Sequence, residues 1–409
     1  MPAHWLSRCV APAALITLIS STPAFAQDEP KAPPKPADHA PATTPAEAPA
    51  VDPFKVPEGN APEELQAFLT RLSKTQPEKR SLPGIREHLR KVESVVAKVQ
   101  EKELDEATAL MSVDIRFMIL RALEARGDEN AASDRDKFVG TLSKHKLPKV
   151  AERGKVYSLA GRIGNLGELK ADGRQKLIDD IAKFIGEGEV TQERFELASN
   201  PPELLAQLGD NEMAAKASEA FAVAFESRKD ERAAELVDRL RSTGRRYGLV
   251  GKPMDVKGKT VDGLDFNLQQ LKGKVVLVDF WATWCGPCLQ EMPHVRELYE
   301  GYHGKGFEVV GVSLDNKREV LQEFLAAEKL PWVQLYSESE GDSGWGNPIA
   351  RYYGISSIPT AILIGKDGNV VSLDANGREL TRLLEKLLGP PEIKPEAPQD
   401  APKDEPKVK

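Results

Sequence analysis

Two cysteines separated by two residues, Cys285 and Cys288, are the side chains of this sequence best suited to chemistry. They lie in the stretch FWATWCGPCLQEMP, directly after an apolar run and at the expected first turn of a helix. The amide groups and the dipole at a helix start favour negative charge, so a thiol there ionises more readily than a free thiol. The spacing also lets the two sulfurs bond without a backbone movement. We therefore predict a redox pair in which Cys285, on the exposed N-terminal side, attacks as the thiolate and Cys288 resolves the mixed disulfide.

The third cysteine, Cys9, falls in a segment with the features of a secretory signal peptide. A short start that includes Arg8 precedes an apolar run too short to span a bilayer, and a small-x-small pattern ends at Ala26. Cleavage after Ala26 predicts an exported, periplasmic protein that begins at Gln27. An uncleaved membrane anchor is the less favoured alternative. A lipoprotein is disfavoured because Cys9 precedes the apolar run instead of following a small residue at its end.

The composition of the exported part argues against several other uses of a cysteine pair. Two cysteines are too few for a framework of structural disulfides. A zinc site needs about four ligands, and the sequence has no second C-x-x-C and no paired histidine motif. The net charge is −7 with 29% charged residues, and no basic block suggests nucleic acid or anionic lipid as a partner. We expect redox chemistry without a metal or another cofactor.

The chain divides by composition into five parts. A signal peptide covers 1–26, and a segment rich in Pro and Ala covers 27–61. An all-helical domain of unknown role is predicted for 62–248, an α/β domain for 249–388, and a Pro-rich tail for 389–409. The Pro-rich segments hold almost no large apolar residues, so they cannot bury a core and are expected to be disordered.

The predicted helical domain is rich in Ala, Glu, Lys, Leu and Arg, and its apolar residues recur at helical spacing. Breaks such as RGDEN, KLPK, GEGEV and SNPPE divide it into eight or nine helices, arranged as a bundle or as stacked helical hairpins. Two apolar stripes carry this prediction: Ile85, Leu89, Val92, Val95, Val96 and Val99, and then Leu177, Ile178, Ile181, Phe184 and Ile185.

Short β-rich runs alternate with helices after Gly251, which indicates a sheet with helices on both faces. Asp367-Gly368 is a strong hairpin signal between the last two strands, so one edge of the sheet is expected to be antiparallel. The predicted strands are Val275–Phe280, Phe307–Leu314, Trp332–Tyr336, Thr360–Gly365 and Asn369–Asp374, and the predicted helices are Cys288–Tyr299, Arg318–Glu328, Pro348–Tyr353 and Glu379–Leu388.

The motif FWATWCGPC in this setting resembles the active site of the thioredoxin superfamily. The stretch SSIPTAILI resembles the family's cis-proline loop and the strand after it, which implies a cis peptide at Ile358-Pro359. The resemblance is closest to exported TlpA-like and ResA-like thiol–disulfide oxidoreductases of the redoxin type. It rests on the run C-x-x-C-x-x-E, on MDVKGKTVDGLDFNLQQLKGK before the first core strand, and on an extra helix and strand from about Lys317 to Tyr336. It covers about a third of the chain and implies a thioredoxin-like fold for Leu249 to Leu388.

The resemblance implies roles for two acids beside the cysteines. Asp279 interrupts the apolar run VVLVDF at a position expected to be buried, where its pKa would rise into a range useful for proton transfer. The matching Asp in thioredoxin serves the buried thiol. Glu291 lies one helical turn after Cys288 and matches a Glu that tunes the pair in TlpA-like proteins, although an ordinary exposed Glu is an equal reading. Possessing both acids is a mixed pattern within the family.

A substrate-binding surface is also implied by the resemblance. The backbone before the cis-proline pairs with the substrate, and the proline ring keeps metals from the thiolates. Trp281 and Trp284 could form an apolar rim for a polypeptide, although Trp281 could equally belong to the core. The predicted substrate-binding residues are Trp284, Gly286, Pro287, Ile358 and Pro359.

The favoured function is an exported reductase of protein disulfides, because Gly286-Pro287 resembles thioredoxin and strong oxidants of the family carry a His before the second Cys. The family further suggests an inner-membrane thiol donor, protein thiols or disulfides as substrates, and apocytochrome c as a possible client. One alternative is a redoxin-type thiol peroxidase, but the P-x-x-x-T-x-x-C arrangement is absent and Thr283 stands two residues before Cys285. The other alternative is an interaction protein whose helical domain binds a partner while the redox domain is accessory.

Overall fold

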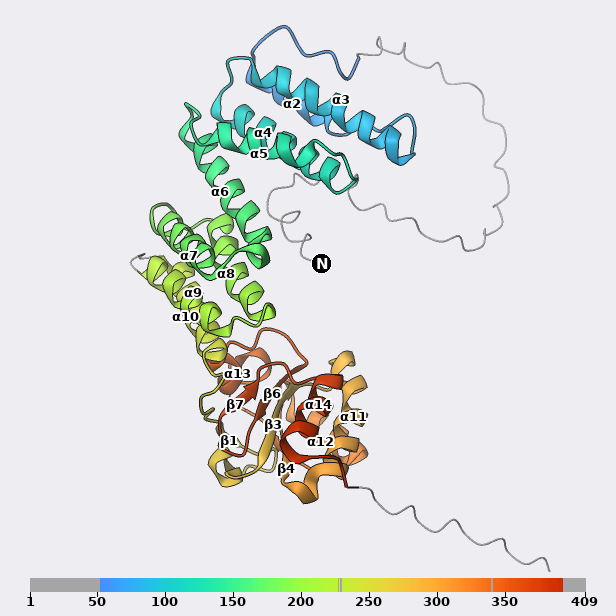
Figure 1. Ribbon diagram of the computed structural model, residues 1–409, viewed down its shortest axis with the longest axis vertical. Coiled ribbons are helices and arrows are strands. Elements are labelled where there is room, and N and C mark those ends of the chain that lie inside the picture. The colour runs from blue at the N-terminus through green and yellow to red at the C-terminus, as the bar shows by residue number, and fades with distance from the viewer. Residues whose placement is uncertain (1–51, 227, 229, 340, 393–409) are drawn as a thin grey trace, which may run out of the picture. The chain divides into compact units, whose positions relative to one another are not determined.

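A computed structural model describes residues 52–226, 228, 230–339 and 341–392 (Figure 1). The predicted signal peptide, the linker before residue 52 and the tail after residue 392 lie outside the described residues. By its internal contacts the chain forms two compact units. One unit takes the chain up to Asn165 together with Gln192–Glu196, and the other takes Leu166–Thr191 and the chain from Leu197 onward. In the part of the chain described above, no helix is long and apolar enough to cross a membrane.

The region before the sheet is helical, as predicted. Across its described residues it forms nine α-helices: α2 (Pro62–Leu72), α3 (Leu82–Gln100), α4 (Glu106–Glu124), α5 (Ala131–Leu142), α6 (Pro148–Gly164), α7 (Ala171–Gly186), α8 (Gln192–Gln207), α9 (Asn211–Glu226) and α10 (Glu231–Tyr247). Local sequence explains where several of them begin. The Asp105 side chain accepts from the backbone N–H groups of Ala107 and Thr108 and caps α4, while Asp230 caps α10.

The two predicted apolar stripes form the buried faces of α3 and α7. In α3 the stripe is buried from Leu89 to Val99, with Ile85 partly buried at its N-terminal end. In α7 every residue of the stripe is buried. These apolar faces account for the helices, because packing of such a face supplies most of the stability of a helix of this length.

The linker predicted to be disordered is ordered at its C-terminal end. Phe54 and Val56 pack against the core formed by α2, α3 and α4. The Phe54 ring lies 6.0 Å from the His88 ring, and Lys91 Nζ lies 3.8 Å from the Phe54 ring centroid. Lys102 Nζ also donates to the carbonyl oxygens of Glu58 and Gly59 at 3.0 and 3.1 Å, so apolar packing and hydrogen bonds together hold this short segment. The predicted disorder of residues 52–61 is therefore wrong.

The sheet domain has a mixed five-stranded sheet with the order β5-β4-β3-β6-β7. β3 is parallel to β4, and β4 is parallel to β5, whereas β6 is antiparallel to both β3 and β7. A small β1–β2 hairpin, which was not predicted, precedes the sheet. The strands are β1 (Lys257–Lys259), β2 (Asp265–Asn267), β3 (Val275–Trp281), β4 (Phe307–Ser313), β5 (Val333–Leu335), β6 (Thr360–Ile364) and β7 (Val370–Ser372). The helices are α11 (Gly286–Tyr302), α12 (Arg318–Glu328), α13 (Pro348–Tyr352) and α14 (Gly377–Leu388).

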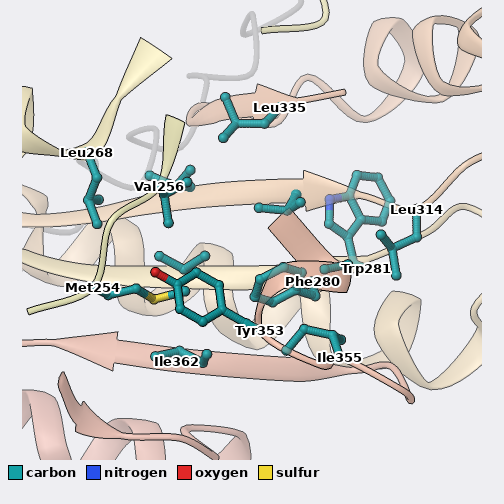
Figure 2. Packing of buried hydrophobic residues seen from close by; sticks show 14 of the residues in the cluster. Met254, Val256, Leu268, Phe280, Trp281, Leu314, Leu335, Tyr353, Ile355 and Ile362 are labelled. Atoms are coloured by element: carbon teal, nitrogen blue, oxygen red, sulfur yellow. The ribbon is translucent and has the colours of Figure 1, made fainter. Parts of the chain in front are cut away.

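Successive side chains of β3 point to opposite faces of the sheet, and both faces are buried. Val276, Val278 and Phe280 belong to a cluster that includes the segment before β3 and the residue Leu321 of α12. Figure 2 shows part of this cluster, with Phe280 and Ile362 on the strands. Val275 and Leu277 belong to the opposite cluster, which contains the buried faces of α11 and α14. This arrangement is the predicted thioredoxin-like fold.

Helix α10 is tied to the sheet domain by direct contacts. Arg245 Nε donates to the carbonyl oxygen of Tyr352 in α13 at 2.9 Å, and the guanidinium lies 4.4 Å from the Tyr352 ring centroid. Leu249 belongs to the core cluster of the sheet. The contacts thus divide the chain after Asn165, whereas composition placed the domain boundary near residue 248. A separate all-helical domain of residues 62–248 stays a prediction.

Candidate active site

The two cysteines occupy the start of α11, and they form a disulfide. Cys285 is the N-cap residue, and its Sγ accepts the backbone N–H of Cys288 at 3.2 Å. This is the position at which the helix start favours a thiolate. Each cysteine is only 5% exposed, so the expected difference in exposure between them is wrong for the disulfide form. The two sulfurs are bonded to each other, and both cysteines belong to the core cluster of the sheet.

The residues next to Cys285 are more exposed than the cysteines themselves. Trp284 before Cys285 is exposed, and so are Gly286 and Pro287 after it. The Ile358-Pro359 peptide is cis, as the resemblance implies, and both of its residues are partly buried. A substrate therefore finds accessible surface on both sides of Cys285.

Trp281 does not share this accessible surface. It is 1% exposed, and its Nε1 donates to Gln334 Oε1 at 2.9 Å. Trp281 is the last residue of β3, and its register partner lies on β4, so its ring lies within the domain. The suggestion that Trp281 and Trp284 together form an apolar rim is wrong, and only Trp284 is available to a substrate.

Asp279 is a partly exposed carboxyl in the central strand β3. Its register partners are Gly311 on β4 and Ala361 on β6, and the Gln334 side chain occupies the space that a Cβ on Gly311 would take. Burial raises the pKa of Asp279 to about 7, and the negative charge of Glu291 adds to this rise. A carboxyl with a pKa near 7 can both accept and donate a proton at neutral pH. Glu291, whose charge acts on Asp279, lies one helical turn after Cys288 on α11.

Glu291 joins the active-site helix to α14. Its Oε1 accepts the backbone N–H of Gly377 at 2.6 Å, and Gly377 is the first residue of α14. The N-cap residue Asn376 makes no side-chain cap hydrogen bond, so Glu291 supplies the acceptor for this helix start. This contact answers the open question about Glu291: the side chain is neither freely exposed nor solely a neighbour of the cysteines.

His294 is a further partner of the same helix start. Its Nε2 lies 3.2 Å from the Gly377 carbonyl oxygen and 3.1 Å from Thr381 Oγ1. Glu291 and His294 are three residues apart on α11, so both face α14. That spacing was visible in the sequence, but the helix that they contact lies more than eighty residues away.

The double role of Glu291 predicts different effects for two substitutions. Glu291→Ala removes the acceptor for Gly377 N–H, and we expect the free energy of unfolding to fall by about 1–2 kcal/mol. Glu291→Gln keeps an oxygen acceptor and should lose less than half of that. Urea denaturation of the disulfide form at pH 5 makes this comparison while Asp279 is mostly protonated, so relief of charge repulsion does not contribute. Equal losses in the two variants would show that the hydrogen bond adds no stability.

A buried carboxylate that was not predicted, Asp315, holds the loop before Cys285. It is 2% exposed and follows the end of β4. Asp315 Oδ1 accepts the Thr283 hydroxyl at 2.6 Å, both carboxylate oxygens lie 3.2 Å from Thr283 N, and Oδ2 accepts the Ser313 hydroxyl at 2.8 Å. One signal could have found it. Parallel strands end at the same edge of a sheet, so an acid just after β4 lies close to the loop after β3.

The comparisons with known proteins agree with this geometry. The sequence model of the Redoxin family matches residues 216–385. Thiol-disulfide oxidoreductase ResA of Bacillus thuringiensis subsp. konkukian is 34% identical over 134 residues, which cover 33% of this chain and 70% of ResA. ResA of Oceanobacillus iheyensis is 33% identical over 123 residues, or 30% of this chain and 60% of that protein.

Among solved structures, the thioredoxin domain of a thiol-disulfide oxidoreductase from Bacteroides vulgatus is 29% identical, with a TM-score of 0.31, and covers 34% of this chain and 97% of that one. A putative thiol:disulfide interchange protein DsbE from Chlorobium tepidum is 31% identical, with a TM-score of 0.29, and covers 34% and 93%. On its identity to ResA and the share of ResA that it covers, this chain belongs to the ResA-like thiol-disulfide oxidoreductases of the redoxin family.

Proposed function

We propose that this oxidoreductase is exported and reduces disulfides in polypeptides with the Cys285–Cys288 dithiol. The observation that carries the proposal is the position of Cys285, which caps α11 between the exposed residues Trp284 and Gly286. A thiolate is favoured at that helix start, and the exposed neighbours give a bulky polypeptide access to it. The Gly-Pro pair between the cysteines supports reduction over oxidation.

The proposed reaction transfers two electrons in two exchanges. The Cys285 thiolate attacks one sulfur of the substrate disulfide, forms a mixed disulfide and releases the other substrate sulfur as a thiolate. Cys288 then loses its proton, and its thiolate attacks Cys285 Sγ. This step releases the second substrate thiolate and leaves the Cys285–Cys288 disulfide seen in the structure. A thiol donor must next reduce that disulfide, and we propose an inner-membrane protein for this role.

The proposed location and client follow from the N-terminal sequence and from the chemistry of the compartment. The N-terminal sequence supports export to the periplasm by a signal peptide cleaved after Ala26. An apocytochrome c is a fitting client, because its thiols must be reduced in an oxidising compartment. The helical region would then position the redox domain or bind a partner.

The peroxidase alternative receives no support from the site. Thr283 is the threonine nearest to the position that a peroxidase of this type uses, and its hydroxyl donates to Asp315 at 2.6 Å. The hydroxyl's one hydrogen is therefore committed to a buried carboxylate. Reduction of polypeptide disulfides remains the better reading of the arrangement.

The reduction potential tests the proposed direction of electron flow. We expect a value close to that of thioredoxin, about −270 mV. The ratio of dithiol to disulfide, measured by thiol alkylation in graded dithiothreitol buffers, gives this potential. A potential above about −180 mV, in the range of protein disulfide isomerase and stronger oxidants, would contradict a reductase.

A further inference from the structure

Two exposed tryptophans meet beside the disulfide, and they come from segments sixty residues apart. Trp284, directly before Cys285, is 52% exposed, and Trp345, in the short turn before α13, is 46% exposed. Their ring centroids lie 6.2 Å apart with an interplanar angle of 56°, within the range of favourable aromatic pairs. Tryptophan is highly buried on average, so two half-exposed indoles in contact mark a surface that is suited to a partner.

Both tryptophans stand on backbone that Asp315 fixes. The Asp315 carboxylate holds Thr283, the residue before Trp284. The Asp315 carbonyl oxygen accepts the N–H of Gly344, the residue before Trp345, at 3.2 Å. The segment at the end of β4 thus sets the spacing between the two rings. A binding surface whose parts are already in place loses little conformational entropy when it is occupied.

The turn that carries Trp345 tolerates only glycine on either side of it. Gly344 has a φ of +58°, and a Cβ there would lie 2.2 Å from Asn316 Oδ1. A Cβ on Gly346 would lie 1.9 Å from the Gly341 carbonyl oxygen. Glycine at both positions lets the backbone take this tight path on either side of Trp345 while its ring stays exposed.

We propose that Trp284 and Trp345 form a two-tryptophan platform that binds an apolar side chain next to the reacting cysteine of a polypeptide substrate. The inference rests on the proposed reduction of polypeptide disulfides. A substrate sulfur must approach Cys285 for the first exchange, so residues next to the substrate cysteine pass over Trp284. An apolar or aromatic side chain there would cover indole surface that is now exposed to water. A small disulfide has no such side chain and gains nothing from the platform.

Two peptides with one disulfide each, identical except for Phe or Ser next to the reacting cysteine, test this preference. We expect the wild-type protein to reduce the Phe peptide with the lower KM. Trp345→Ala should raise the KM for the Phe peptide about tenfold, the size of a lost aromatic contact of roughly 1.4 kcal/mol, and should leave kcat unchanged. It should not change the KM for the Ser peptide or the rate with bis(2-hydroxyethyl) disulfide, a small disulfide that carries no apolar or aromatic group. Trp345→Phe, which keeps an aromatic ring, should restore most of the preference.

Tyr352→Ala is the matched control, because Tyr352 is a 54% exposed aromatic residue of α13 that contacts Arg245. It should leave both KM values unchanged. An unaltered Phe-to-Ser preference in folded Trp345→Ala would overturn the platform. Sedimentation in which the wild-type protein is a dimer and Trp345→Ala a monomer would also overturn it, since a second copy would then cover the two rings. A wild-type protein that reduces bis(2-hydroxyethyl) disulfide but neither peptide would instead refute the proposed function.

Discussion

Cys285→Ser lowers polypeptide disulfide reduction to the level of buffer alone, and Cys288→Ser leaves a protein that still captures substrate as a mixed disulfide. The helix start at α11 favours negative charge on Cys285, and Cys288 lies within the first turn. Without Cys285 the first exchange has no attacking thiolate. Without Cys288 the mixed disulfide forms but is not resolved. Insulin reduction with dithiothreitol as the donor measures the first effect, and non-reducing electrophoresis detects the second.

Exposure does not assign these roles, since the two cysteines are equally buried in the disulfide form. The assignment depends on thiol ionisation and is checked independently by alkylation. A limiting amount of iodoacetamide near neutral pH should modify Cys285 first in the reduced wild-type protein. Equal modification of both cysteines would contradict the assignment of attacking and resolving thiols.

Asp279→Asn slows resolution of the mixed disulfide by roughly 100-fold near neutral pH, the lower end of the range expected when a general base is removed. In the proposed mechanism the Asp279 carboxylate, with its pKa near 7, accepts the proton that leaves Cys288 before this thiol attacks. Capture of substrate by Cys285 should change little. The wild-type resolution rate should rise with pH through about 7, whereas the variant should rise only as the thiol itself ionises. Stopped-flow measurement of the two exchanges separates them.

The same substitution, Asp279→Asn, should stabilise the folded protein above neutral pH even though it slows resolution. The carboxyl of Asp279 keeps its proton up to about pH 7 in the folded protein but loses it near 3.8 when unfolded. Between these values the folded state binds more protons, so the wild-type free energy of unfolding falls as the pH rises. Asp279→Asn abolishes this fall, and the disulfide form of the variant should be more stable at pH 8 by on the order of 1–3 kcal/mol, discounted because the side chain is partly exposed.

At pH 4 the two proteins should be nearly equal in stability. Glu291→Gln provides the control, because it removes the nearby charge without removing the carboxyl of Asp279. It should shift the midpoint of the resolution rate to lower pH. A less stable Asp279→Asn protein with unchanged resolution kinetics would show that Asp279 is a structural hydrogen-bond partner, and Glu291 would become the preferred acid.

The parts of this site that could be predicted are those whose residues are neighbours along the chain. An apolar strand followed by C-x-x-C at a helix start defines β3, the cysteine pair and Asp279. The cis peptide at Ile358-Pro359 required the family resemblance, because isomer state is not readable from a dipeptide. The predicted strand ends differ from the observed ones by one or two residues. Residues at the end of a strand can fit the alternating pattern without being paired in the sheet.

The parts that escaped prediction depend on residues far apart in sequence. Asp315 and Thr283 are thirty-two residues apart, and the Trp284–Trp345 pair forms only when two loops fold back on one edge of the sheet. Glu291 has a visible position on α11, but its partner Gly377 becomes known only once α14 packs beside it. Apart from Asp315, whose place after a parallel strand could have been read as close to the loop after β3, a single sequence carries no signal for such pairs, since each partner is an ordinary residue in its own segment.

A single-turnover reaction tests the central claim that the cysteine pair reduces polypeptide disulfides. Fully reduced wild-type protein is mixed, without any other thiol, with a polypeptide that contains one disulfide, and mass spectrometry after acid quenching counts the products. We predict that each Cys285–Cys288 disulfide formed accompanies the loss of one substrate disulfide and the appearance of two substrate thiols. Retention of the substrate disulfide, while added hydrogen peroxide oxidises the pair rapidly, would contradict the account.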